Sequence, residues 1–351
     1  MAETLAEGAE GKKADLEKLA ADVKGAIARR NFPWFDPTAG ETVLVPSGQG
    51  RGYWVGAPSV VEDQDGRVLL SYRRRRPRDG SNGERGYLAA IAESTDGGMS
   101  FSDIWSITKH QVGTSSLERF CLRPDTSTET TGARPSAAAR AASAPRWRLY
   151  TSWEDPPSSG RWRVDLIKAA APDAFELAAA TPVLLAAEVG VDAVKDPYVV
   201  QNVPWAEPDL MYLSTFLTPT GPAPTSLASS PDGTKFAWEG TALATGTGWD
   251  AYQARISSVA PFGSGFVAYY DGATTPADDT EEHCGVAVSV DLRHWRSATQ
   301  RGPVLVSPHA TGSLRYVEVA RLGGQWWAYY EYARPDGAHE LRRNRLPDLG
   351  P

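Results

Sequence analysis

The side chains best suited to chemistry in this sequence are carboxylates and guanidinium groups placed where predicted strands begin or end. Arginine is the usual partner of a carboxylate or a planar polar ligand. Crowded carboxylates push their pKa values apart, so that one can serve as an acid and another as a base. The candidate catalytic residues are Glu118, Asp196, Asp250 and Glu318. The candidate substrate-binding residues are Tyr53, Trp54, Arg73, Arg119, Tyr252, Arg255, Asp271, Arg315 and Glu331.

A repeated phrase indicates which elements position these groups. Ala57-Pro58-Ser59-Val60-Val61 returns as Asp196-Pro197-Tyr198-Val199-Val200, and each copy is followed by a second predicted strand. Five such pairs of strands occur, and the second strand of each ends in or near aromatic residues. The two copies differ at their first letter, where Ala57 stands against Asp196.

A turn with Asp in its third position recurs later in the units. Asp caps backbone N–H groups, Gly takes the left-handed conformation and a following aromatic residue anchors the turn, so its expected role is structural. Three of these turns start at residues 171, 230 and 289, which gives two equal steps and indicates a repeat. Five units of about four strands predict an all-β fold, a five-bladed β-propeller with an N-terminal α-helix.

A propeller would gather the candidate residues at one place. The first strand of each blade lines the central channel and begins at one mouth, and the antiparallel second strand ends at that same mouth. Each of these residues could instead have a purely structural role. Asp196 before Pro197 can simply cap a turn, Glu118–Arg119 and Arg315–Glu318 can form salt bridges between blades, and Tyr53 and Trp54 can be packing residues.

Outside the repeat, residues 11–30 carry Leu16, Leu19, Ala20, Val23 and Ile27 at helical spacing. This amphipathic helix is expected to pack on the main domain, or alternatively to form a homodimer contact. The predicted division is a helical extension over 1–41 and the propeller over 42–351. Residues 42–45 are expected to supply the outer strand of the fifth blade, and residues 125–146 are interpreted as an insertion in the second.

Composition limits the partners. The net charge of -7 argues against nucleic acid, and no apolar run approaches the roughly 18 residues of a membrane span. The N-terminal residues lack a basic stretch followed by an apolar one, so no signal peptide is expected. Two cysteines, Cys121 and Cys284, lack a metal-ligand spacing and fit a reducing cytoplasm. We therefore expect a cytoplasmic protein with a small-molecule substrate, no metal and no cofactor.

The chain resembles the five-bladed propellers of glycoside hydrolases of the family 43 and family 32 type. The resemblance covers roughly residues 50–335 and rests on Asp196-Pro197, on Ser-x-Asp-Leu-x-x-Trp at 289–295 and on the Tyr-Tyr second strands. It implies three carboxylates at blade starts: a base or nucleophile, an orienting acid and a general acid. Lys195-Asp196-Pro197 is similar to the orienting motif, Ala57 stands where the blade-one acid is expected, and Asp250 stands where Glu is more usual.

Three functions follow from this pattern. The first is a glycosidase with rearranged acids, in which Glu118 or Glu318 works with Asp250. The second is a propeller of bacterial secondary metabolism that performs proton transfer on a non-sugar substrate. The third is a non-catalytic binder of carbohydrates or metabolites that uses an aromatic mouth.

Overall fold

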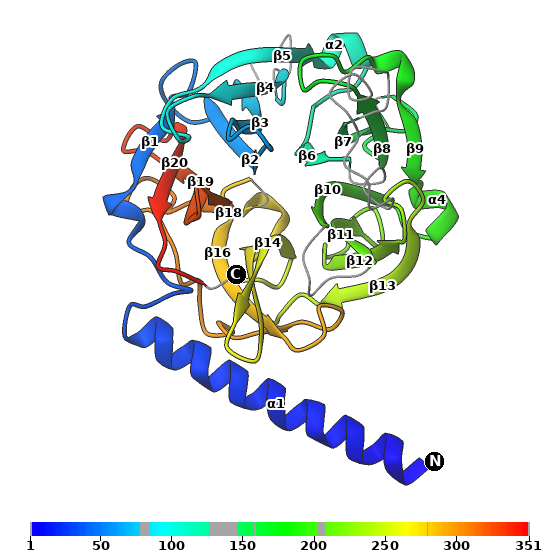
Figure 1. Cartoon of the computed structure of the whole chain (residues 1–351), viewed down its shortest axis with the longest axis vertical. Helices are drawn as coiled ribbons and strands as arrows, with labels where there is room; N and C mark the ends of the chain where they lie inside the picture. Colours follow the sequence, from blue (N-terminus) through cyan, green and yellow to red (C-terminus); the bar gives the residue numbers. More distant parts are fainter. Residues whose placement is uncertain are drawn as a thin grey trace.

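The computed structural model describes residues 2–77, 85–125, 146–157, 159–201, 208–278 and 280–349, with side chains from residue 11 onward. Strands dominate, and they form sheets arranged in a ring around a central axis, which is the arrangement of a β-propeller (Figure 1). The all-β propeller prediction is confirmed. The predicted insertion at 125–146 falls almost wholly outside the described residues.

Strand pairing gives one eight-stranded sheet and three four-stranded sheets among the described strands, and the eight-stranded sheet consists of two antiparallel groups of four joined by a single parallel bridge. We therefore describe the strands as five antiparallel groups of four. The first contains β2 (Trp54–Glu62), β3 (Val68–Arg75), β4 (Leu88–Ser94) and β5 (Ser102–Thr108). The second contains β6 (Cys121–Pro124), β7 (Trp147–Glu154), β8 (Trp162–Ala169) and β9 (Thr181–Leu184). The third contains β10 (Ala193–Val200), β11 (Asp209–Phe216), β12 (Thr225–Ser230) and β13 (Ala237–Leu243).

The fourth group contains β14 (Gln253–Phe262), β15 (Gly265–Ala273), β16 (His283–Ser289) and β17 (Arg296–Ser297). The fifth contains β18 (Leu314–Leu322), β19 (Gln325–Ala333), β20 (His339–Arg345) and the N-terminal β1 (Glu41–Leu44). We call these groups blades 1 to 5. β1 pairs antiparallel with β20, as expected from the sequence, so the two ends of the chain close the ring within one blade. One parallel bridge, Trp54 to His339, also joins blade 1 to blade 5.

The recurring turns connect neighbouring blades. A tyrosine on the second strand of one blade donates a hydrogen bond from its hydroxyl to a backbone oxygen in the turn of the next blade. The pairs are Tyr150 with Gly233 (2.8 Å), Tyr212 with Leu292 (2.5 Å) and Tyr329 with Gly98 (3.1 Å). Within each turn the Asp accepts backbone N–H groups, as at Asp96, Asp232 and Asp291. The turns are thus joints between blades, and their structural interpretation agrees with these contacts.

The described helices are few. They are α1 (Ala2–Ala28), the short α2 (Lys109–Val112) and α4 (Ala186–Val189), and 3₁₀ turns at Pro37–Ala39, Leu177–Ala179 and Pro276–Asp278. α1 lies along the outside of the ring (Figure 1). Its buried Leu19, Ala20 and Val23 pack with Ala260 and Val267 of blade 4, so the apolar face of the helix is used within the chain. Over the described residues, none of the helices has the length and apolarity that crossing a membrane requires.

The packing of α1 predicts the effect of a cavity at Val23, which is fully buried. Val23→Ala should lower the free energy of unfolding by about 1–3 kcal/mol, because two buried methyl groups are lost and a void is left. The measurement is urea unfolding followed by circular dichroism. The control is Lys24→Ala, whose side chain is exposed and which should stay close to wild type. Equal midpoints for the two variants would show that the helix does not contribute to propeller stability.

Candidate functional site

The first strands place their polar residues at one mouth of the channel by means of a shared backbone irregularity. The pairing of first with second strand shifts register after Gly56, Lys195 and Arg315 in blades 1, 3 and 5. The next residue in each case has a left-handed backbone: Ala57 at φ 52°, Asp196 at φ 55° and Tyr316 at φ 52°. Non-glycine residues in this region are uncommon and gather at functional sites. The backbone therefore shows that Ala57 and Asp196 occupy equivalent positions.

Arg255 on β14 is the centre of the site. Its guanidinium binds three carboxylates: Asp196 at 3.1 Å, Asp271 at 3.0 Å and Glu282 at 2.9 Å. Asp196 and Asp271 are wholly buried, and Arg255 and Glu282 are each 1% exposed. The ring of Tyr316 lies beneath the guanidinium, 3.9 Å from its carbon. One arginine thus gathers acids from blades 3 and 4.

A second arginine extends this cluster toward blade 5. Arg315 binds Glu282 and also Glu331, the latter at 2.6 Å. His339 at the start of β20 contacts Glu331 at 2.8 Å through Nδ1, and its Nε2 contacts Glu281 at 3.1 Å. Gly56 lies against the Glu331 side chain, which would collide with any Cβ at that position.

Arg119 connects the acids on the other side of the channel. Its backbone N–H donates to Asp196 at 2.9 Å, and its guanidinium binds Glu318 at 2.5 Å. The same guanidinium donates to the backbone oxygens of Pro58 and Ser257, in blades 1 and 4. The carboxylate of Asp196 therefore binds groups of neighbouring blades, so its role is not that of a simple cap on its own turn.

Glu118 belongs to the same mouth. Its carboxylate binds Arg73, and Arg73 also donates to the Tyr316 hydroxyl at 2.9 Å. That hydroxyl in turn donates to Asp196 at 3.4 Å. The salt bridges expected between blades exist, but the partners differ from the expected pairs: Glu118 binds Arg73, and Glu318 binds Arg119.

The predicted catalytic residue Asp250 makes its described side-chain contacts away from this network. Asp250 accepts a hydrogen bond from Tyr270 at 2.8 Å and lies near Gly246, so its described contacts are within blade 4. The backbone of Tyr252 bonds to Ala223 and Ala273. Tyr53 is half-buried and packs over Gly48, and its backbone oxygen accepts a hydrogen bond from the N–H of His339 at 3.0 Å, so it adjoins the network. Asp250, which the sequence suggested as a catalytic partner for Glu118 or Glu318, therefore faces β15 and not Asp196. The loop before β14 directs its carboxylate toward Tyr270 on that strand.

Trp54 is buried at the rim of the network. Its ring stacks on His339 with centroids 4.6 Å apart, and the guanidinium carbon of Arg315 lies 5.0 Å from it. Sequence reasoning placed Tyr316 at the start of the blade-five first strand but left Glu282 and His339 out of the site. A signal existed for both, because they stand where third strands begin, and third strands start at the same mouth as first strands. In the described part of the chain, no three His, Cys, Asp or Glu residues are arranged to hold a metal ion.

The carboxylates of the network differ in proton affinity. Burial raises the pKa of Asp271 to about 6, with Glu282 adding to the effect and Arg255 opposing it. Burial also raises the pKa of Glu318, against Arg119 and Arg123. For Glu282 and Glu331 burial is outweighed by Arg315, and their pKa values fall below the usual range. Two neighbouring carboxyl groups whose surroundings push their pKa values apart can serve as an acid and a base.

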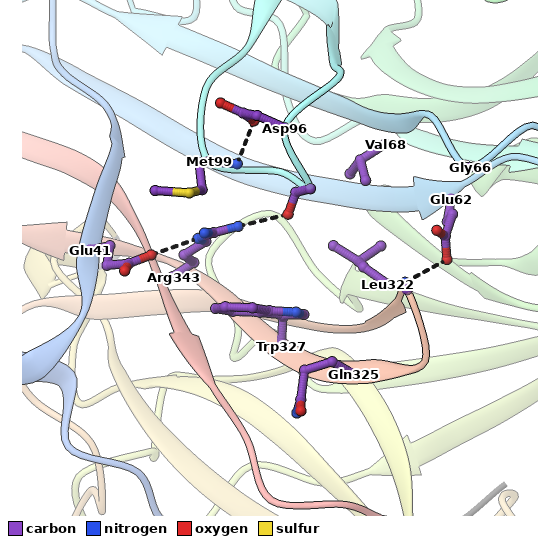
Figure 2. Close-up of a pocket in the computed structure, with 12 residues that line it drawn as sticks. Glu41, Glu62, Gly66, Val68, Asp96, Met99, Leu322, Gln325, Trp327 and Arg343 are labelled. Carbon is purple, nitrogen blue, oxygen red and sulfur yellow. Dashed lines mark hydrogen bonds and ion pairs between the residues drawn. The ribbon is translucent and has the colours of Figure 1, made fainter.

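A separate hollow of about 610 Å³ lies between blades 1 and 5, at the turns that join first to second strands (Figure 2). Its charged groups are engaged in local contacts: Arg343 with Glu41 at 2.9 Å, and Glu62 with the backbone N–H of Gly323 at 2.9 Å. None of the predicted site residues lines it. The network at the channel mouth, which holds most of the predicted site residues, is therefore the stronger candidate site.

Comparison with known proteins supports the fold. No protein-family model and no curated protein matches the sequence. A solved structure described as a glycoside hydrolase aligns over 89% of this chain and 94% of its own, with a TM-score of 0.62 and 14% identity. A thermostable family-43 glycoside hydrolase aligns over 89% and 97%, with a TM-score of 0.59 and 13% identity. A family-43 enzyme from Xanthomonas citri complexed with xylose aligns over 93% of both chains, with a TM-score of 0.56 and 14% identity. The resemblance to glycoside hydrolase propellers is thereby confirmed for the fold.

The raised pKa of Asp271 predicts a pH effect on stability. Because the pKa rises from 3.8 to about 6 in the folded chain, the stabilisation is complete below pH 3.8 and is lost as pH rises through about 6. Asp271→Asn should remove this component. Melting temperatures of both proteins from pH 3.5 to 7.5 test it, because the wild-type curve should fall relative to the variant curve as pH rises. Parallel curves would show that folding does not shift the pKa of Asp271.

The position of Arg255 predicts a large loss of stability when its charge is removed. Arg255→Met leaves three buried carboxylates without their shared cation and should cost about 3–5 kcal/mol of unfolding free energy. The matched control is Arg293→Met, which breaks a partly exposed pair with Glu239 and should cost about 0–1 kcal/mol. Urea unfolding of the two variants and the wild type measures these losses of unfolding free energy. Similar small losses would mean that the network relaxes when the arginine is absent.

Proposed function

We propose that the protein is a glycoside hydrolase-like enzyme that acts on a small glycoside or glycosylated metabolite by carboxylate acid–base chemistry at the channel mouth. The observation that carries this proposal is the guanidinium of Arg255, which holds Asp196, Asp271 and Glu282 together. Asp271 and Glu282 both bind Nη2 of Arg255, at 3.0 and 2.9 Å, so the two bonded carboxylate oxygens lie within about 6 Å of each other. Glycoside hydrolysis uses carboxyl pairs about 5 to 10 Å apart.

The separated pKa values support particular roles. Asp271, with its pKa raised to about 6, is the group best suited to donate a proton to a leaving group near neutral pH. Glu282, with its pKa lowered beside Arg315, is suited to remain a carboxylate and to accept a proton from water. Asp196 would orient the ligand, in keeping with its resemblance to the orienting acid. This set differs from the one expected from sequence, because Asp271 and Glu282 take the acid and base roles that were expected of Glu118, Asp250 and Glu318.

Turnover of aryl glycosides tests the proposal. A panel of such glycosides should contain at least one that the wild type hydrolyses, with kcat/KM reduced about 10²–10⁴-fold in Asp196→Asn and in Asp271→Asn. Asp250→Asn should retain most of the activity, because its contacts lie with Tyr270 outside the network. Absence of turnover on every sugar, or equal losses in all three variants, would count against a glycosidase.

One observation favours a second candidate, the proton-transfer enzyme acting on a non-sugar substrate. Ala57 occupies the position equivalent to Asp196 in blade 1, so the blade-one acid that the resemblance implies is replaced by a methyl group. A hydrolase that lacks its base or nucleophile loses most of its rate. A wild type that binds small acids at the mouth but turns over no glycoside would favour this alternative.

A further inference from the structure

His339 stands at the point where blades 1, 4 and 5 meet. It is wholly buried at the start of β20, and its backbone N–H donates to the carbonyl of Tyr53 at 3.0 Å. Its ring stacks on Trp54 of blade 1. The two ring nitrogens contact Glu331 of blade 5 and Glu281, which comes just before β16 of blade 4. One side chain thus touches three blades.

Both polar partners of the imidazole are carboxylates. Nδ1 lies 2.8 Å from Oε1 of Glu331, and Nε2 lies 3.1 Å from Oε2 of Glu281. A neutral imidazole has one N–H group and one lone pair, whereas an imidazolium has two N–H groups. An ionised carboxylate only accepts hydrogen bonds. Between two ionised carboxylates, His339 therefore forms both hydrogen bonds only when its ring is doubly protonated.

The surroundings keep the two carboxylates ionised. Burial opposes the ionisation of Glu331, but Arg315, which binds it at 2.6 Å, outweighs burial and holds its pKa below the usual range. For Glu281, burial is outweighed by the contact with His339 and by the Thr311 hydroxyl, which donates at 2.6 Å, so the pKa of this carboxyl is also lowered. Two negative oxygens therefore face the two sides of one buried ring.

Further charged groups surround this unit: Arg51, Arg75, Arg315 and Asp336. Arg51 is largely exposed and binds Oε1 of Glu281 at 3.0 Å. The guanidinium carbons of Arg75 and Arg315 lie 4.5 and 5.0 Å from the centre of the indole on which His339 stacks. Asp336, on the hairpin of His339, accepts backbone N–H groups at 3.1 Å. The cations oppose a charge on the ring, so its second proton depends on the two carboxylates that it contacts.

The contact with Glu281 bears on the candidate site because the next residue is Glu282. The two consecutive side chains bind different cations: Glu281 binds His339, and Glu282 binds Arg255 at 2.9 Å and also Arg315. Only one peptide unit separates the two residues, so a shift of Glu281 away from the imidazole also shifts Glu282. The ring of His339 thus acts on the network through its neighbour on the chain.

We propose that His339 is a proton-dependent clamp that, as an imidazolium, ties blades 1, 4 and 5 together at the channel mouth. Through Glu281 it holds the neighbouring Glu282 in place at Arg255. When the ring loses one proton to solvent, it can donate to only one of the two carboxylates, and the clamp loosens. His339 is therefore a positioning residue. The inference rests on the proposed function only in so far as Glu282 is the base of the reaction.

Nitrogen NMR of protein labelled in its five histidines tests the charge without requiring turnover. At pH 7.5 both ring nitrogens of His339 should carry a proton, whereas an unperturbed histidine loses its second proton at about pH 6.5. In Glu281→Gln the ring should become neutral at a lower pH than in the wild type, because an amide can donate to Nε2. His339→Gln identifies the signal. If that variant does not fold, replacing the other four histidines identifies it by elimination.

A neutral His339 in the wild type at pH 7.5 would overturn the inference. The same titration in the wild type and in Glu281→Gln would overturn it too, because the second carboxylate would then have no part in holding the proton.

Melting temperatures from pH 6 to 9 test the clamp itself. The wild type should exceed His339→Gln by a margin that shrinks as the pH rises. The stabilisation is complete below about pH 6.5, where the unfolded chain also keeps the proton, and is lost as the folded ring releases it at higher pH. The control is His294→Gln, whose exposed ring contacts one carboxylate, Asp291, at 3.0 Å and which should stay close to the wild type at every pH.

A margin that is constant over this pH range contradicts the inference, because a ring that only packs on Trp54 gives no such pH dependence. Glu281→Gln replaces His339→Gln in this comparison if the latter does not fold. Its margin should also shrink with rising pH, since it removes one of the two charges that hold the proton.

The outcomes separate this inference from the proposed function. For a glycoside that the wild type hydrolyses, kcat in Glu281→Gln should decline at a lower pH than in the wild type, and an unchanged pH profile would contradict the link from Glu281 to Glu282. Turnover of glycosides by a protein in which His339 is neutral at pH 7.5 would overturn this inference alone. NMR and melting results as expected, without turnover of any glycoside, would overturn the glycosidase proposal alone.

Discussion

The structure depends on the neutralisation of charges that are buried where the blades meet. Ionised groups removed from water are tolerated only when they are paired and hydrogen-bonded. Arg255 satisfies three carboxylates, and Arg119 ties Asp196 to Glu318. Because the partners come from different blades, the ion pairs fix the blades relative to one another around the channel. The joints at the periphery, where tyrosine hydroxyls bond to the turns of the next blade, complete the same ring from outside.

This arrangement places several buried ion pairs at one mouth. Burial raises the pKa of Asp271 to about 6, whereas at Glu282 burial is outweighed by Arg315 and Arg255, which lower its pKa. Glu118 lies at the same mouth and forms an ion pair with Arg73. The separated proton affinities of Asp271 and Glu282 are the feature on which the proposed acid–base chemistry depends. These groups lie at the ends of strands that the same repeat places together.

The comparison of Ala57 with Asp196 gains weight from the backbone. Both residues, and Tyr316 in blade 5, adopt a left-handed conformation at the same register shift. The methyl group of Ala57 makes no hydrogen bond that could stabilise the left-handed backbone. The conformation is therefore a feature of the repeated strand pair, and it is present even where the acid is absent. The fold thus resembles glycoside hydrolase propellers, whereas Ala57 stands where the resemblance implies an acid.

The sequence by itself determined the propeller, the N-terminal helix and the closure of the ring by residues near 42–45. Strands and turns are local patterns, and their repetition at equal steps along the chain allows them to be recognised. It also indicated that Asp196, Arg255, Asp271 and Arg315 approach one mouth. Only the tertiary structure decided which charges pair. It moved Asp250 out of the network and brought Glu282 and His339 into it, since those partners come from different blades and loops. Pairing across blades depends on distances that no spacing along the chain encodes.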